Sequence, residues 1–130
     1  MKRLGLRTLV TAGLVVALAP LLAAGTLTRD VDGLRVELTS RPGRPTANGQ
    51  TEYVVRLMDH TGQPVSGAQL TLRGVMADGM SIVAPLRPVG DAGVYRGRVL
   101  FTMEGRWELM LRIAREGKRL ELLLVEHVER

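Results

Sequence analysis

A regular alternation of apolar and polar side chains between Gly93 and Ile113 constrains this chain more than any other feature of its sequence. Alternation with a period of two is typical of a β-strand that buries one face and exposes the other. The pattern predicts two strands joined by a short turn over residues 102–105, which we expect to form a hairpin. Three of the four aromatic residues lie in this stretch, so the hairpin is expected to supply the bulkiest part of the core. The predicted inward-facing residues are Tyr95, Val99, Phe101, Trp107, Leu109, Leu111 and Ile113.

Five further segments alternate in the same way and are separated by residues that favour turns, among them Glu116 and Gly117. About seven short strands predict an all-β fold, an immunoglobulin-like β-sandwich, with a small open barrel as the alternative. The last strand is apolar on both faces at Leu123 and Val125, which predicts a central or covered position. The five segments span residues 34–39, 53–58, 68–73, 82–86 and 119–126.

The first 25 residues have a basic start, a long apolar run and small residues at their end, which is the layout of a secretory signal. Residues 4–24 approach the length of a membrane-spanning helix, so retention as a membrane anchor is the alternative to cleavage after Gly25. We therefore predict a signal or anchor (1–25), a polar linker (26–32) and one sandwich domain (33–130). Either fate of the leader predicts an extracytoplasmic domain, periplasmic or at the cell surface.

The basic net charge of +5 does not indicate nucleic-acid binding, because Lys2, Arg3 and Arg7 belong to the leader. The remaining chain carries 15 basic and 13 acidic residues, which interleave along the predicted strands without a basic run. Cysteine is absent, which excludes disulfides, thiol catalysis and cysteine-based metal sites. Binding to nucleic acid is therefore not expected.

The sequence contains no pattern that predicts catalysis, so we expect a protein that is not an enzyme. The three serines of the domain lie in predicted loops or turns, outside any hydrolase nucleophile motif. His60 and His127 have no histidine or carboxylate at ligand spacing, which favours solvated positions. Asp59 and Asp78 lie at predicted turns, where Asp forms local hydrogen bonds.

Met76 and Met80 flank three residues of a predicted loop and offer two thioether sulfurs, which are ligands that Cu(I) prefers. The structural alternative is that these methionines fill irregular gaps at the end of the sandwich. Met103 and His60 are the further candidate ligands, since each lies in a predicted turn. The sequence does not decide at which end of the sandwich either turn lies.

These segments resemble a known family. The run from Asp59 to Leu72 is similar to strand-turn-strand elements of bacterial Ig-like modules, and the second half of the chain resembles the YtkA-like domain family and its FixH-like relatives. The resemblance covers Leu34 to Glu126 and implies a short exported protein with one Ig-like domain. FixH-like relatives are associated with assembly of copper-containing terminal oxidases, and some family members carry Met/His-rich segments where this chain has VMADGMS. The second-half residues are Met76, Met80, Pro85-Leu86, Gly93 to Gly97, Phe101 and Gly105 to Leu109.

Two functions are therefore predicted. The preferred one is a non-catalytic extracytoplasmic binding module, an accessory or assembly factor that binds a protein partner in or at the membrane or a periplasmic ligand. The alternative is a periplasmic Cu(I) carrier or chaperone that uses the loop methionines.

Overall fold

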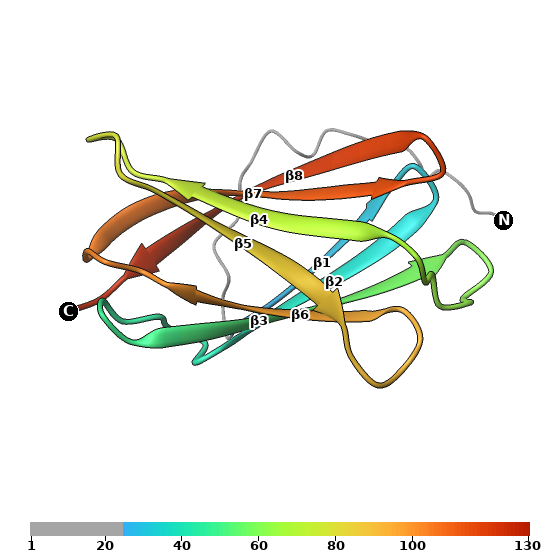
Figure 1. Cartoon of the computed structure of the whole chain (residues 1–130), viewed down its shortest axis with the longest axis horizontal. Coiled ribbons are helices and arrows are strands. Elements are labelled where there is room, and N and C mark those ends of the chain that lie inside the picture. Colours follow the sequence, from blue (N-terminus) through green and yellow to red (C-terminus); the bar gives the residue numbers. More distant parts are fainter. Residues whose placement is uncertain (1–24) are drawn as a thin grey trace, which may run out of the picture.

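The computed structural model describes residues 25–130, which form eight β-strands (Figure 1). Within this range, no helix is long and apolar enough to cross a membrane. The predicted signal or anchor, apart from Gly25, lies outside the described residues. The strands are β1 (Thr26–Val31), β2 (Leu34–Arg41), β3 (Gln50–Asp59), β4 (Gln69–Val75), β5 (Ser81–Pro88), β6 (Val94–Leu100), β7 (Gly105–Arg115) and β8 (Lys118–Val128).

The eight strands form one antiparallel sheet in the order β1-β2-β3-β6-β5-β4-β7-β8, folded over into two layers (Figure 1). β5 connects the layers, because most of it pairs with β4 whereas Arg87 and Pro88 at its end pair with β6. Among the described strands, β1 and β8 are outermost and the ladder between them is not closed. The fold is therefore an all-β sandwich that approaches an open barrel, and it combines the two predicted architectures.

The core lies between the layers, where the inward faces of the alternating strands meet. All four aromatic side chains are fully buried. The rings of Phe101 and Trp107 are 5.3 Å apart between centroids and are tilted by 60°. Position 97 requires glycine because β5 and β6 approach closely there. A Cβ at this position would lie 2.6 Å from the carbonyl oxygen of Pro85.

The predicted hairpin between β6 and β7 is wrong. β6 pairs with β3 and β5, whereas β7 pairs with β4 and β8, so the connection over residues 101–104 passes from one layer to the other. Phe101 and Trp107 face the shared core from opposite sides of this crossing. Alternation specifies which face of a strand is buried but not which strand lies beside it. The predicted hairpin and the observed crossing between layers would bury the same residues.

Residues 26–32, predicted as a linker, form strand β1 and its turn into β2. Asp32 and Gly33 have φ angles of 50° and 76°, which is the two-residue turn that an Asp-Gly pair favours. The same geometry confirms the predicted turn at Glu116 and Gly117, with φ angles of 51° and 75°. β1 was missed because its polar outer residues conceal the alternation of Leu27 and other partly buried side chains.

The last strand, β8, is predicted to be central or covered, and the central position is wrong, since β8 is outermost in the strand order. On its outer face Leu123 is exposed whereas Val125 is buried. Apolar side chains on both faces of a strand therefore do not by themselves indicate that a neighbouring strand lies on each side.

Candidate functional site

Two segments far apart in the sequence meet at one end of the sandwich and bring three methionines there. These segments are the β4–β5 turn, which holds Met76 and Met80, and the β6–β7 connection, which holds Met103 (Figure 1). The Thr102 hydroxyl lies 3.8 Å from the Met80 sulfur, and a Cβ at Gly105 would lie 2.8 Å from Cε of Met76. We call this end, defined by Met76, Met80 and Met103, the methionine end.

The β4–β5 turn is held rigid by its own hydrogen bonds. The amide of Met76 donates to the carbonyl of Met80 at 2.8 Å, and the amide of Gly79 donates to the carbonyl of Met76 at 3.0 Å. The Asp78 carboxylate accepts from the Met80 amide at 3.0 Å, which confirms the predicted local role of this aspartate. Met76 and Met80 therefore flank the turn, one directly after β4 and the other directly before β5.

The β6–β7 connection is fixed to the core by Trp107, whose indole N–H donates to the carbonyl of Met103 at 3.0 Å. Because Trp107 is fully buried, the position of Met103 is set by the core rather than by the loop alone. Met76 is partly buried and packs against the core, as the gap-filling interpretation predicts for one of the two turn methionines. Met80 and Met103 remain exposed.

The methionine end is also the most apolar exposed part of the described chain. Six large apolar side chains are exposed among residues 25–130, and four of them lie at or beside this end. Exposed apolar side chains gathered in one part of a surface mark a candidate binding surface. The four exposed fractions are 43% for Val75, 38% for Met80, 48% for Leu100 and 43% for Met103.

His60 lies at the opposite end of the sandwich, in the β3–β4 loop. This loop leads into the start of β4, whereas the methionine turn follows the end of the same seven-residue strand. Such a strand spans roughly 20 Å. The structure thus brings Met76, Met80 and Met103 together and does not bring His60 to them.

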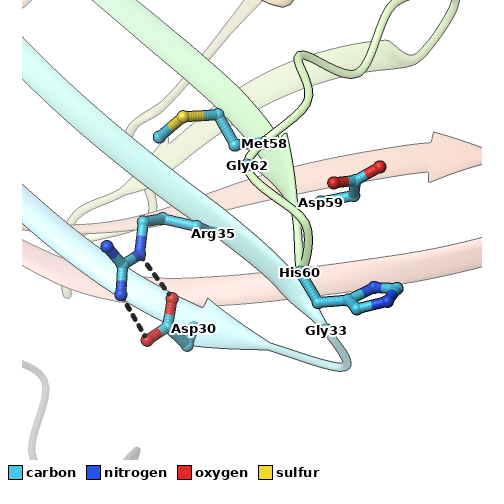
Figure 2. Close-up of a pocket in the computed structure, with 7 residues that line it drawn as sticks. All are labelled: Asp30, Gly33, Arg35, Met58, Asp59, His60 and Gly62. Carbon is cyan, nitrogen blue, oxygen red and sulfur yellow. Dashed lines mark hydrogen bonds and ion pairs between the residues drawn. The ribbon is translucent and has the colours of Figure 1, made fainter.

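A cleft of about 450 Å³ at this opposite end includes His60 in its lining, but its polar groups are engaged locally (Figure 2). Arg35 donates to both carboxylate oxygens of Asp30, at 2.9 and 3.2 Å. The Asp59 carboxylate accepts from the Thr61 amide and hydroxyl and from the Gln63 amide, and these hydrogen bonds, the Thr61 hydroxyl foremost, lower its pKa.

The side chains around the cleft do not converge on one point. Figure 2 shows Met58 and Arg35 directed to one side, and Asp59 and His60 to the other. Across residues 25–130, no three or more His, Cys, Asp or Glu side chains are grouped as a metal site would require. The cleft therefore offers separate polar groups rather than a ligand set.

A buried polar contact that the sequence analysis did not predict joins the two layers near the methionine end. The hydroxyl of Tyr53 on β3 donates to the carboxyl of Glu126 on β8 at 2.8 Å. Glu126 is 4% exposed, and burial raises its pKa to about 7 although the hydrogen bond from Tyr53 opposes the shift. Burial and the nearby Glu126 carboxyl together raise the pKa of the Tyr53 hydroxyl above its usual range.

A signal for this contact is present in the sequence. Glu126 continues the alternation of Leu120, Leu122 and Leu124, so it occupies an inward position of β8. An acidic residue at an inward position needs a hydrogen-bond partner, and a buried tyrosine is a suitable donor.

The fold defines the chain as an all-β sandwich protein, and a match to a family model gives its family. Residues 28–112 match the family described as YtkA-like, so the chain belongs to the YtkA-like family, as the resemblance predicted. The relation to FixH-like proteins stays a prediction. No curated protein matches the chain.

Solved structures support the fold. A DUF4426 family protein from Pseudomonas aeruginosa is similar with a TM-score of 0.64 and 15% identity, covering 81% of this chain and 95% of that one. The Lin-41 filamin domain is similar with a TM-score of 0.51 and 18% identity, covering 67% of this chain and 83% of that domain. At these identities the likeness shows an Ig-like fold alone.

Proposed function

We propose that this protein is a non-catalytic extracytoplasmic binding module, an accessory or assembly factor for a membrane or periplasmic complex, and that the methionine end is its binding surface. The observation that carries the proposal is the gathering of exposed apolar side chains at this end. Exposed apolar side chains are expensive to leave in water unless another molecule covers them. The leader of residues 1–25 supports the extracytoplasmic location.

The methionines suit this role for a further reason. Methionine is unbranched and flexible, so it adapts to the shape of an apolar partner. Met103 and Met80 project from segments that hydrogen bonds hold in place, which limits the entropy lost on binding. The surface thus combines a rigid frame with adaptable side chains.

The test is photocrosslinking in the membrane fraction of the producing cells. A photoreactive amino acid at position 103 of the full chain is expected to give a discrete protein adduct. The matched control carries the same amino acid at position 123, which is also apolar and exposed but lies midway along β8. Equal adducts from both positions, or none from position 103, would contradict the proposal.

A second candidate function is a Cu(I) carrier, and the position of Met76, Met80 and Met103 at one end of the sandwich favours it. Cu(I) is soft and accepts two or three sulfur ligands without requiring charge from the protein. Met76, Met80 and Met103 form this candidate set, and His60 is left out of it because it lies at the other end. A Cu(I) carrier would load and release the ion at the exposed side of the methionine end.

The copper candidate is tested by Cu(I) competition titration of the purified chain under reducing, oxygen-free conditions. The double variant Met76→Leu/Met80→Leu is expected to lose stoichiometric binding, because leucine keeps the volume and removes the sulfur. Met110→Leu, on the outer face of β7, is the matched control and should bind as the parent does. Binding that is indifferent to Met76 and Met80 would exclude this use of the methionines.

A further inference from the structure

Four arginines gather on the outer face of one layer of the sandwich, where β2, β3 and β6 lie side by side (Figure 1). Arg41 of β2 and Arg98 of β6 lie on either side of Glu52 of β3, directly opposite it in register. Arg96 lies two positions before Arg98 on β6, opposite Arg87 of β5. All four arginines are exposed, and residues directly opposite each other on antiparallel strands share one face of the sheet. We call Arg41, Arg87, Arg96 and Arg98 the arginine face.

The positive charge of the arginine face exceeds the negative charge that lies beside it. The Glu52 carboxylate lies 3.3 Å from Nε of Arg96. Arg41, Arg87 and Arg98 form no ion pair with any other residue of the range 25–130. Arg87 and Arg96 are directly opposite each other, an arrangement of like charges that destabilises a sheet. A bound anion would relieve this repulsion.

A cleft of about 330 Å³ on the same face extends the basic surface. Its lining includes Arg41, Arg56 and Arg96, together with Glu37 and Asp91. Glu37 lies directly opposite Arg56 in register, which places these two opposite charges together. Three guanidinium groups and two carboxylates leave the lining with a net positive charge.

The outward arginines of β7, in the other layer, are paired within the domain. Arg106 lies 2.9 Å from the carboxylate of Glu108. Arg112 likewise lies 3.0 Å from the carboxylate of Glu121 on β8. The arginine face differs from this arrangement, because three of its four guanidinium groups are available to another molecule.

We infer that the arginine face binds an acidic segment of another protein, whose carboxylates pair with Arg41, Arg87 and Arg98. A guanidinium group and a carboxylate form two parallel hydrogen bonds, which favours arginine over lysine at such sites. The residues of this surface are not those of the methionine end, so this binding goes beyond the proposed function and is independent of it.

The spacing of the arginines favours an extended segment over a single small anion. Arg41 and Arg98 lie two strands apart, roughly 10 Å, and the Glu52 carboxylate between them repels an anion placed at the centre. Side chains on one face of a strand repeat about every 7 Å, both along β6 and along an extended acidic segment. Carboxylates at alternate residues of such a segment therefore match the repeat of the arginines.

The test measures binding of a fluorescent peptide of alternating glutamate and serine to the purified full chain, by fluorescence anisotropy at low salt. A peptide with glutamine in place of glutamate is the uncharged control and is expected not to bind. The variant Arg41→Gln/Arg98→Gln should bind the acidic peptide about tenfold more weakly, because it removes two contacts between arginine and carboxylate. Its fold should be unchanged, since neither arginine has an ion pair within residues 25–130.

The matched control is Arg73→Gln/Arg119→Gln, which removes the same charge from exposed positions on the other layer. Its affinity for the acidic peptide should stay within about twofold of the parent's. Equal losses in the two double variants would show that net charge alone attracts the peptide and would overturn the inference. Failure of the parent chain to bind the peptide would do the same. An oligonucleotide that binds the arginine face more tightly than the peptide does would assign a nucleic acid to it and also overturn the inference.

The single variant Arg87→Gln distinguishes a binding surface from a solvated strand face. It removes the like charge opposite Arg96, so the thermal denaturation midpoint is expected to rise. The affinity for the acidic peptide is expected to fall in the same variant. A higher midpoint with unchanged affinity would show that Arg87 does not contact the peptide and would contradict the inferred site.

Discussion

The two ends of the sandwich each contain a buried tyrosine hydroxyl, and the two hydroxyls have different partners. Near the His60 end, Tyr95 donates to the carbonyl of Val65 at 2.8 Å and accepts from the amide of Ala68 at 3.2 Å. Near the methionine end, Tyr53 donates to the carboxyl of Glu126. Backbone groups do not ionise, whereas a carboxyl does. The tyrosine contact near the His60 end therefore does not itself depend on pH, whereas the one near the methionine end does.

The outer surfaces of the two ends also differ, since one exposes polar groups and the other exposes apolar side chains. At the His60 end, carboxylates satisfy neighbouring backbone and side-chain donors, and the Tyr95 contact holds the loop on the core. At the methionine end, apolar side chains face outward above a buried ionisable group. The first end thus exposes polar groups that are bonded within the domain, and the second exposes the apolar side chains on which the proposed binding function rests.

The largest expected effect comes from removing the indole that fixes the methionine end. Trp107→Ala should lower the free energy of unfolding by roughly 3–5 kcal/mol, because it empties a fully buried site and frees the Met103 carbonyl. Urea denaturation followed by circular dichroism measures this. Trp107→Phe keeps much of the ring and should cost clearly less. Equal losses of unfolding free energy in the two variants would show that packing of the Trp107 ring is not the cause of the destabilisation.

The pH dependence of stability comes next. Because the pKa of Glu126 is raised to about 7, the folded protein holds this proton more tightly than the unfolded chain does. The stabilisation is complete below the ordinary pKa near 4.5 and is lost as pH rises through 7, a fall of about 3 kcal/mol. Denaturation midpoints between pH 5 and 8 measure it. Glu126→Gln should remove most of this slope, and an unchanged slope would contradict the assignment.

A pair of matched substitutions tests the comparison of the two ends directly. Tyr95→Phe should lower the free energy of unfolding by about 1–2 kcal/mol at every pH, since it leaves the Ala68 amide and the Val65 carbonyl without this partner. Tyr53→Phe removes the hydrogen bond that lowers the pKa of Glu126, so the pH transition should move upward. Denaturation at pH 5 and pH 8 distinguishes them. Identical pH profiles for the two variants would contradict the claim that only the Tyr53 contact depends on pH.

The smallest effect is expected for the two turn methionines, of which Met76 is partly buried and Met80 is exposed. Met76→Leu/Met80→Leu should change the free energy of unfolding by less than about 1.5 kcal/mol, because leucine is close to methionine in volume. Thermal denaturation of the double variant beside Met110→Leu measures it. A loss comparable to that of Trp107→Ala would mean that the turn methionines serve the core rather than a surface.

Much of the fold was predictable from local pattern. The inward residues of β2, β3, β4 and β7 follow the alternation, and the Glu116-Gly117 turn has the expected left-handed backbone. The first strand was missed although the Asp32-Gly33 pair is a strong hairpin signal. Its outer residues are polar and its inner ones only partly buried, so the apolar pattern that identifies a strand is weak there.

The candidate site was predictable only in its residue types. Met76 and Met80 stand close together in the sequence, and soft sulfur ligands suggest their chemistry without a structure. Which of Met103 and His60 joins them depends on the ends at which two distant loops lie. Glu126 could have been found from its inward position, but its partner Tyr53 is 73 residues away.

The sequence by itself determined which side chains of each strand face the core, because side-chain direction alternates with every residue of an extended backbone. The tertiary structure decided which strands are neighbours, that β6 and β7 lie in opposite layers, and that the segments holding Met76, Met80 and Met103 lie at one end of the sandwich. The reason is physical. Several strand orders would bury the same apolar side chains. Only the packing of all eight strands together selects one of these orders.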